Sequence, residues 1–157
     1  MSKASDIITA YTKAGLMIAT AESCTGGLIA GALTDIAGSS NVVDRGFVTY
    51  SNEAKMDMLG VSLQTLDKYG AVSDQTAYEM ALGALNNSCA DVTIAVTGIA
   101  GPGGGSDEKP VGLVYMGVAN NDGVQTYKLL LGEDKTREEI RQATVDRALS
   151  ELLMMIS

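Results

Sequence analysis

Histidine and tryptophan are absent from this 157-residue sequence, and there are only two cysteines. Without histidine neither a Ser-His-Asp triad nor a Cys-His pair can form, so nucleophilic chemistry must take its base from lysine, tyrosine or a carboxylate. Cys24 and Cys89 are too few for a disulfide framework and have no metal-like spacing. We therefore expect two reduced thiols, no metal and no other cofactor.

Positive charge is also scarce. The sequence has 11 Lys and Arg residues against 19 Asp and Glu residues, which gives a formal net charge of −8. An acidic surface without a Lys/Arg stripe argues against nucleic-acid binding, although a small phosphate ester can still be held locally. No apolar run approaches the roughly 18 residues of a membrane span, and the chain does not start like a signal peptide. We expect a cytoplasmic protein without a membrane partner.

Apolar periodicity and turn residues predict an α/β protein with a single three-layer α/β/α domain over residues 1–157. Two antiparallel strands joined at residues 120–123 should follow three parallel ones, in a mixed, mostly parallel sheet. The expected strands are 16–21, 42–50, 92–97, 111–119 and 124–131. The expected helices are 2–14, 26–35, 51–59, 62–70, 74–87 and 136 to the C-terminus.

Two turns rich in glycine each follow an apolar run, at residues 20–27 and 97–105. The first leads into a helix, so it should offer free N–H groups and the positive end of a helix dipole to an anion. The second lacks the P-loop pattern, which argues against an ATPase. If the first three strands are parallel, both turns and residues 50–55 converge at one sheet edge.

The residues at that edge permit acyl transfer. Ser23 can attack a carbonyl if Lys55, with its pKa lowered by burial, takes the proton, and the N–H groups of residues 24–27 can form an oxyanion hole. Cys24 competes for the role of nucleophile, and the residues alone leave that choice open. Arg137 and Arg141, one turn apart, can grip a phosphate or pair with acidic side chains, and Arg137 is the better candidate.

Four segments together resemble the CinA C-terminal domain family of nicotinamide-nucleotide amidases, the PncC type: TAESCTGG (20–27), YSNEAK (50–55), TGIAGPGGG (97–105) and KPVG (109–112). The resemblance covers nearly the whole chain. It implies a stand-alone amidase that hydrolyses nicotinamide mononucleotide to nicotinate mononucleotide and ammonia, in pyridine nucleotide recycling, without a metal.

The resemblance also implies roles for individual residues. Ser23 would be the acylated nucleophile, Lys55 its base, and Tyr50 a hydrogen-bonding member of the same network. The implied substrate-binding residues are Thr25, Gly26, Gly27, Thr97, Gly98, Gly101, Gly103, Gly104 and Arg137.

Two other functions stay open at this point. One is a nucleotide-binding module without turnover, acting through partners in a competence or DNA-damage setting. The other is an amidase that uses Cys24 on a different amide. The apolar tail at residues 152–156 can complete the core or bury itself against another subunit, and we expect a homo-oligomer.

Overall fold

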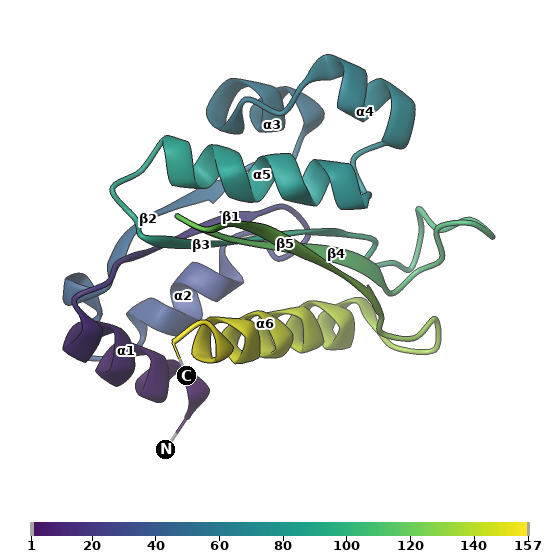
Figure 1. Cartoon of the computed structure of the whole chain (residues 1–157). Helices are drawn as coiled ribbons and strands as arrows, with labels where there is room; N and C mark the ends of the chain where they lie inside the picture. The colour runs from purple at the N-terminus through teal and green to yellow at the C-terminus, as the bar shows by residue number, and fades with distance from the viewer. Residues whose placement is uncertain (1, 157) are drawn as a thin grey trace.

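The computed structural model describes residues 2–156, in which a five-stranded sheet lies between two layers of helices (Figure 1). The strands are β1 (Ile18–Glu22), β2 (Val43–Val48), β3 (Val92–Gly98), β4 (Leu113–Asn120) and β5 (Gly123–Leu130). One face is covered by α1 (Lys3–Ala14), α2 (Leu28–Thr34) and α6 (Arg137–Met154), and the other by α5 (Asp74–Asn86). Outside α5 lie α3 (Asn52–Leu59) and α4 (Leu63–Tyr69), while a short 3-10 turn, η1 (Ser39–Asn41), precedes β2.

The strand order is β2-β1-β3-β4-β5, with β1 parallel to both β2 and β3, and with β4 antiparallel to β3 and β5. The α/β class, the mixed sheet and the order of the elements are confirmed, and the expected hairpin turns where Asn120 pairs with Gly123. Of the four neighbouring pairs two are parallel and two antiparallel. The carboxyl ends of β1, β2 and β3 therefore meet at one edge.

Most helices begin at a hydroxyl residue, as their sequence predicts. Ser51, for example, accepts the amide of Ala54 at 3.0 Å, and Thr136 forms a capping box with Glu139 at the start of α6. The helix expected from residue 26 is the exception, because Gly26 and Gly27 have φ angles of 58° and 104° and α2 starts only at Leu28. Those two glycines therefore belong to the turn after β1 rather than to the helix.

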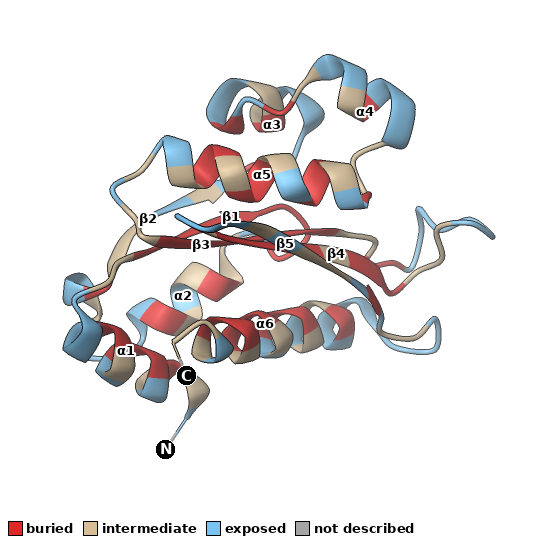
Figure 2. Ribbon diagram, viewed as in Figure 1, coloured by how far each residue is buried: buried red, intermediate tan, exposed pale blue. Residues whose placement is uncertain are grey.

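Buried residues lie in the sheet and on the sides of the helices that face it, and they form two apolar clusters (Figure 2). On the α5 face the residues in contact are small, and the backbones approach closely. A Cβ on Gly83 of α5 would lie 1.9 Å from the carbonyl oxygen of Leu59, and one on Gly117 of β4 would lie 2.5 Å from that of Ala77. Gly83 thus lets α5 pass directly beneath the end of α3.

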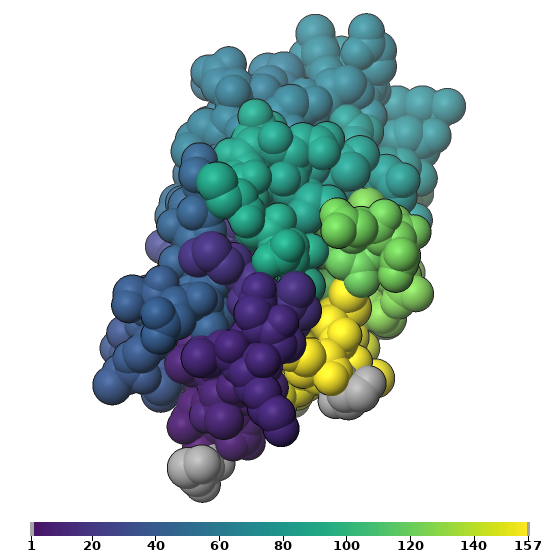
Figure 3. Space-filling view, turned by 60° about the vertical axis from the view of Figure 1, so that its left-hand side comes forward, coloured from purple at the N-terminus to yellow at the C-terminus, as the bar shows by residue number. Residues whose placement is uncertain are grey.

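The first and last helices lie side by side, as the purple and yellow segments of Figure 3 show. The buried Tyr11 hydroxyl donates to the carbonyl of Leu152 at 2.7 Å, and Lys3 pairs with Asp146 at 2.8 Å. Leu152 is fully buried and Ile156 packs against the same core, whereas Met154 is 68% exposed. Most of the apolar tail therefore completes the core of the chain itself.

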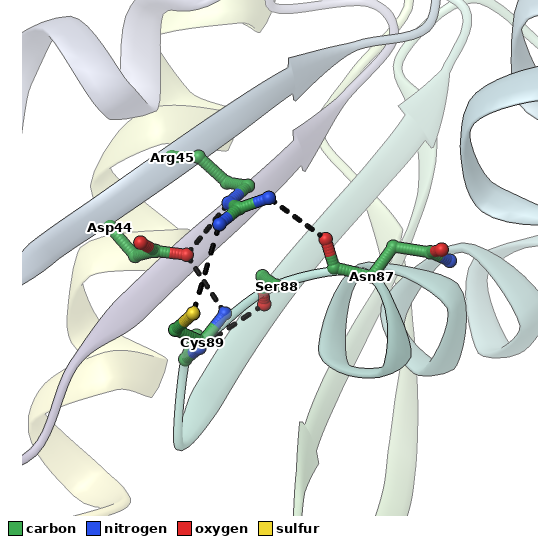
Figure 4. A network of polar contacts seen from close by, with 6 residues as sticks. Asp44, Arg45, Asn87, Ser88 and Cys89 are labelled. Atoms are coloured by element: carbon green, nitrogen blue, oxygen red, sulfur yellow. Dashed lines mark hydrogen bonds and ion pairs between the residues drawn. The ribbon is translucent and has the colours of Figure 1, made fainter.

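A polar network ties β2 to the loop between α5 and β3, at the sheet edge opposite the converging carboxyl ends (Figure 4). The Asp44 carboxylate accepts the amide of Cys89 at 2.9 Å. Arg45 donates to the carbonyl of Asn87 at 3.2 Å and lies 3.8 Å from the Cys89 sulfur. The network fixes the edge strand to its neighbours.

Candidate active site

Ser23 and Lys55 meet at the carboxyl edge of the sheet. Ser23 follows β1 directly, and the Ser51 cap starts α3 so that Lys55 lies one turn into that helix. Lys55 is only 1% exposed. Its Nζ lies 3.0 Å from Ser23 Oγ, 2.9 Å from the carbonyl oxygen of Thr49 and 3.1 Å from that of Tyr50.

The environment of Lys55 favours the neutral amine. Burial lowers the pKa of Lys55, opposed only by a weaker effect of Cys24, and each ion pair within residues 2–156 joins other side chains. A neutral amine has two N–H bonds, which suit the carbonyls of Thr49 and Tyr50, and its lone pair then faces the Ser23 hydroxyl. This is the geometry of a general base beside its nucleophile.

The pair lines a pocket of about 260 Å³ that is bounded by segments from several elements. The convergence of the two glycine-rich turns with residues 50–55 is thus present in the structure. The predicted site residues that line the pocket are Ser23, Tyr50, Lys55, Thr97, Gly98, Gly101, Gly103, Gly104 and Arg137. Sequence reasoning missed Ala71 and Val72, which also line it and carry no motif.

Thr25, Gly26 and Gly27 are outside that lining. The buried Thr25 hydroxyl donates to Glu22 at 2.6 Å, and the Gly26 amide donates to the carbonyl of Ser23 at 3.1 Å. Gly27 is the residue before α2, and a Cβ there would lie 3.5 Å from the side chain of Val48. The Thr25 hydroxyl and the Gly26 amide are therefore used within the turn, whereas the backbone amide of Thr25, next to the pocket-lining Cys24, has no oxygen acceptor among residues 2–156.

The start of α2 also differs from the expectation of free amides. The carboxylate of Glu22, fully buried, accepts the amides of Ile29 at 2.8 Å and Ala30 at 3.0 Å. A carboxylate of the chain itself thus takes the place expected for a ligand's anion. Within the described residues 2–156 the amides of Cys24, Thr25 and Gly27 in this turn have no oxygen acceptor, and those of Cys24 and Thr25, which directly follow Ser23, are the candidate donors for an oxyanion.

Tyr50 joins the network through its backbone carbonyl, and its side chain points elsewhere. The residue is 63% exposed, and its hydroxyl accepts a hydrogen bond from Arg137 at 3.1 Å rather than contacting Ser23 or Lys55. Arg137 also donates to the carbonyl of Gly101 at 2.8 Å. At the other end of the glycine-rich loop, Lys109 donates to the carbonyl of Tyr69 at 2.6 Å. The segment from Gly101 to Lys109 is therefore held to α6 through Arg137 and to the end of α4 through Lys109.

Thr97 and Gly98 shape the pocket wall. The Thr97 hydroxyl, on a residue that is 1% exposed, donates to the carbonyl of Ala71 at 2.7 Å and so holds the segment that precedes α5. A Cβ on Gly98 would lie 2.6 Å from the side chain of Val114, so the backbone here needs the small residue. Both contacts fix the end of β3.

Cys24 lines the pocket but is poorly suited to attack. The residue is 6% exposed, and burial raises the pKa of the thiol to about 11. The thiolate, which is the nucleophilic form, is therefore scarce at neutral pH. The Lys55 amine lies 3.0 Å from Ser23 Oγ, within reach of the serine proton, which favours Ser23 as the nucleophile.

Neither a metal centre nor a membrane-spanning helix is found in the part of the chain that the structure describes. Residues 2–156 contain no group of three or more Cys, Asp or Glu side chains placed to hold a metal ion. None of the helices in this range is both long enough and apolar enough to cross a bilayer.

Comparison with known proteins identifies the family. The CinA C-terminal domain model matches residues 1–156. The chain is 58% identical to "nicotinamide-nucleotide amidohydrolase PncC" of Enterobacter agglomerans, over 89% of this chain and 85% of that protein. It is 53% identical to a "putative competence-damage inducible protein" of Caldicellulosiruptor bescii, over 92% of this chain, but it spans only 34% of that protein's length.

Solved structures agree with this assignment. The competence/damage inducible protein CihA of Agrobacterium tumefaciens superimposes with a TM-score of 0.96 at 60% identity, covering 99% of this chain and 94% of that one. A CinA superfamily protein of Escherichia coli superimposes with a TM-score of 0.92 at 37% identity, covering 98% and 88%. The chain belongs to the CinA C-terminal domain family.

Proposed function

We propose that this chain hydrolyses the carboxamide of nicotinamide mononucleotide, giving nicotinate mononucleotide and ammonia. The observation that carries the proposal is the buried contact of 3.0 Å between Lys55 Nζ and Ser23 Oγ inside a pocket. A relative that is 58% identical and named a nicotinamide-nucleotide amidohydrolase supports the choice of substrate.

In the proposed acylation, the neutral Lys55 amine takes the Ser23 proton as Oγ attacks the carboxamide carbon. The amides of Cys24 and Thr25, which have no oxygen acceptor among residues 2–156, stabilise the oxyanion, an effect of about 3–4 kcal/mol for each well-placed donor. The Lys55 ammonium then gives its proton to the leaving nitrogen. The C–N bond breaks, ammonia leaves, and an ester on Ser23 remains.

Deacylation reuses the same base. Lys55, neutral again, takes a proton from a water molecule that attacks the ester carbonyl, and the tetrahedral intermediate collapses by expelling Ser23 Oγ. Ser23 recovers its proton from Lys55, and the product, a carboxylic acid, gives its proton to solvent water and leaves as a carboxylate. Every other proton step uses one amine, so neither histidine nor a metal ion is required.

The pocket suits a small aromatic amide that carries an anion. Ala71, Val72 and Ile99 supply apolar surface for a pyridine ring. Arg137 lines the same pocket and is anchored to the glycine-rich loop, where it can pair with a phosphate despite the net charge of −8. These features favour the nucleotide over an uncharged amide.

The first test is ammonia release from nicotinamide mononucleotide by chelator-treated protein, compared with Ser23→Ala and Cys24→Ala. We expect turnover in the parent, a loss of about 10⁴-fold or more in Ser23→Ala, and retained activity in Cys24→Ala. Saturable nucleotide binding without ammonia release would favour the non-catalytic binding module. Activity that survives Ser23→Ala would move the nucleophile to Cys24.

The pH dependence of the reaction tests the base. Because burial lowers the pKa of Lys55, the amine should be neutral over a wider pH range than an ordinary lysine. We expect kcat/KM to fall as the pH drops through the pKa of Lys55 and to level off above it, with the midpoint below the usual lysine value of about 10.4. A profile without this rise would contradict a lysine base.

The proposed reaction belongs to pyridine nucleotide recycling. The cytoplasmic location and the homo-oligomeric state stay predictions from the sequence.

A further inference from the structure

Two charged side chains hold the turn that carries Ser23 without lining the pocket. Glu22 precedes Ser23 at the end of β1, and Arg141 reaches the turn from α6. Neither takes part in the proton transfers proposed above. Their contacts nevertheless determine how the peptide groups after Ser23 are oriented.

The Glu22 carboxylate binds the turn to α2. It accepts the Thr25 hydroxyl at 2.6 Å and the amides of Ile29 at 2.8 Å and Ala30 at 3.0 Å. A fully buried carboxylate is costly unless such donors surround it, and here the start of a helix adds a favourable dipole. Thr25 is thereby fixed relative to α2.

Arg141 holds the opposite side of the turn. Its Nε donates to the carbonyl of Cys24 at 3.0 Å and its Nη2 to that of Thr25 at 3.2 Å. At Gly26 a Cβ would lie 3.5 Å from Nη2, so the guanidinium lies directly against the turn. Two nitrogens of the planar Arg141 guanidinium thus donate to two successive peptide carbonyls.

The hydrogen bonds from Arg141 orient the turn that carries the N–H donors proposed for the oxyanion. In a trans peptide the C=O and the following N–H point in opposite directions, so binding the Cys24 carbonyl turns the Thr25 N–H away from Arg141. A cation on the carbonyl also polarises the peptide and strengthens the N–H as a donor. The amide of Thr25 has no oxygen acceptor within residues 2–156, so it is available to a ligand.

We propose that Arg141 and Glu22 are positioning residues of the amidase, which fix the Ser23 turn so that its amides meet the oxyanion. The inference rests on the proposed function. It differs from the expectation that Arg141 either binds phosphate or pairs with acidic side chains, because its guanidinium donates to two backbone carbonyls of the turn.

The test compares Arg141→Met with Arg147→Met, the same substitution on the same helix at an arginine that pairs with Glu151. In Arg141→Met we expect kcat to fall about 10²-fold while KM changes less than about threefold, because the loss affects the transition state. The pH midpoint of kcat/KM should stay in place, since Arg141 is not among the groups that shift the Lys55 pKa. Arg147→Met should stay within about twofold of the parent.

Three further variants separate positioning from folding. Arg141→Lys offers a point charge instead of a fork, so kcat should recover only in part. Guanidinium ion at millimolar concentration should raise the kcat of Arg141→Ala, which leaves space for it, but not that of Arg141→Met. Glu22→Gln turns an N–H toward the amide of Ala30 in place of an acceptor, and kcat should fall about tenfold.

The rate at which a fluorophosphonate labels Ser23, read by mass spectrometry, measures positioning without the substrate. Labelling should be about tenfold slower in Arg141→Met than in the parent. Parent-like kcat and labelling in Arg141→Met, or in Arg141→Lys if the methionine variant does not fold, would overturn the inference. An equal loss in Arg147→Met would also overturn it, whereas a parent that labels but releases no ammonia contradicts the proposed function alone.

Discussion

Replacing Lys55 by methionine should lower kcat for ammonia release by about 10⁴-fold or more while the protein stays folded. The methionine side chain fills a similar volume but cannot accept the Ser23 proton, and the lysine amine lies 3.0 Å from Ser23 Oγ. Without a base the hydroxyl remains a weak nucleophile at neutral pH. Steady-state ammonia release, with circular dichroism as the check on folding, measures the effect.

The same substitution at Lys68 is the control, because Lys68 is exposed near the end of α4. Lys68→Met should leave kcat within about twofold of the parent.

The lowered pKa of Lys55 also has a consequence for the pH dependence of folding stability. Since the unfolded chain binds the proton more tightly, the contribution of Lys55 to folding should improve as the pH rises from the folded-state pKa toward the ordinary lysine value. A Lys55→Met enzyme that still turns over would contradict the mechanism.

Replacing Gly83 by alanine should cost about 3 kcal/mol of folding free energy and lower kcat as well. A Cβ at this position would lie 1.9 Å from the carbonyl oxygen of Leu59, and that atom belongs to backbone that cannot rotate away. Leu59 ends α3, the helix that carries Lys55. Separating α5 from α3 should therefore move Lys55, the proposed base, away from Ser23. Urea unfolding and steady-state kinetics measure the two effects.

Gly31→Ala is the matched control for that prediction. Gly31 lies in α2 and is exposed, and a Cβ there would have no atom within 4 Å beyond its own helix backbone and chain neighbours. Alanine is favoured over glycine in a helix by about 1 kcal/mol, so this variant should be as stable as the parent or slightly more stable. A Gly83→Ala protein with parent stability would show that α3 and α5 are not in rigid contact.

The fold could be predicted because its signals are local. Buried strands such as β1 and β3 are mostly apolar segments between turn residues, and hydroxyl caps mark the start of most helices. The sequence places the start of α2 two residues too early, because Gly26 and Gly27 resemble the small residues of the helix that follows. Their positive φ angles depend on the turn, which sequence periodicity does not reveal.

The part of the site that the sequence predicted is the part that depends on strand topology alone. Parallel strands bring Ser23 and Lys55 to the same edge, and the pair is found there. The direction of a side chain is a different matter, because Tyr50 turns its hydroxyl to Arg137 and Thr25 turns its own to Glu22. The first choice depends on a partner 87 residues away, and the second on how the turn after β1 folds back on Glu22, three residues earlier. Nothing in the sequence indicated that the carboxylate of Glu22 would accept the amides at the start of α2.

The position of Arg141 in the chain has a consequence for biosynthesis. Ser23 and Lys55 precede α6, so the ribosome makes both side chains of the proposed catalytic pair before Arg141, which binds the turn that carries Ser23. Domains generally fold from the N-terminal side as they emerge, and here the last helix must dock against α1 and α2 before Arg141 reaches the carbonyls of Cys24 and Thr25. If the earlier elements fold first, the nascent chain holds its proposed nucleophile and base in an unfinished site, and docking of α6 completes it.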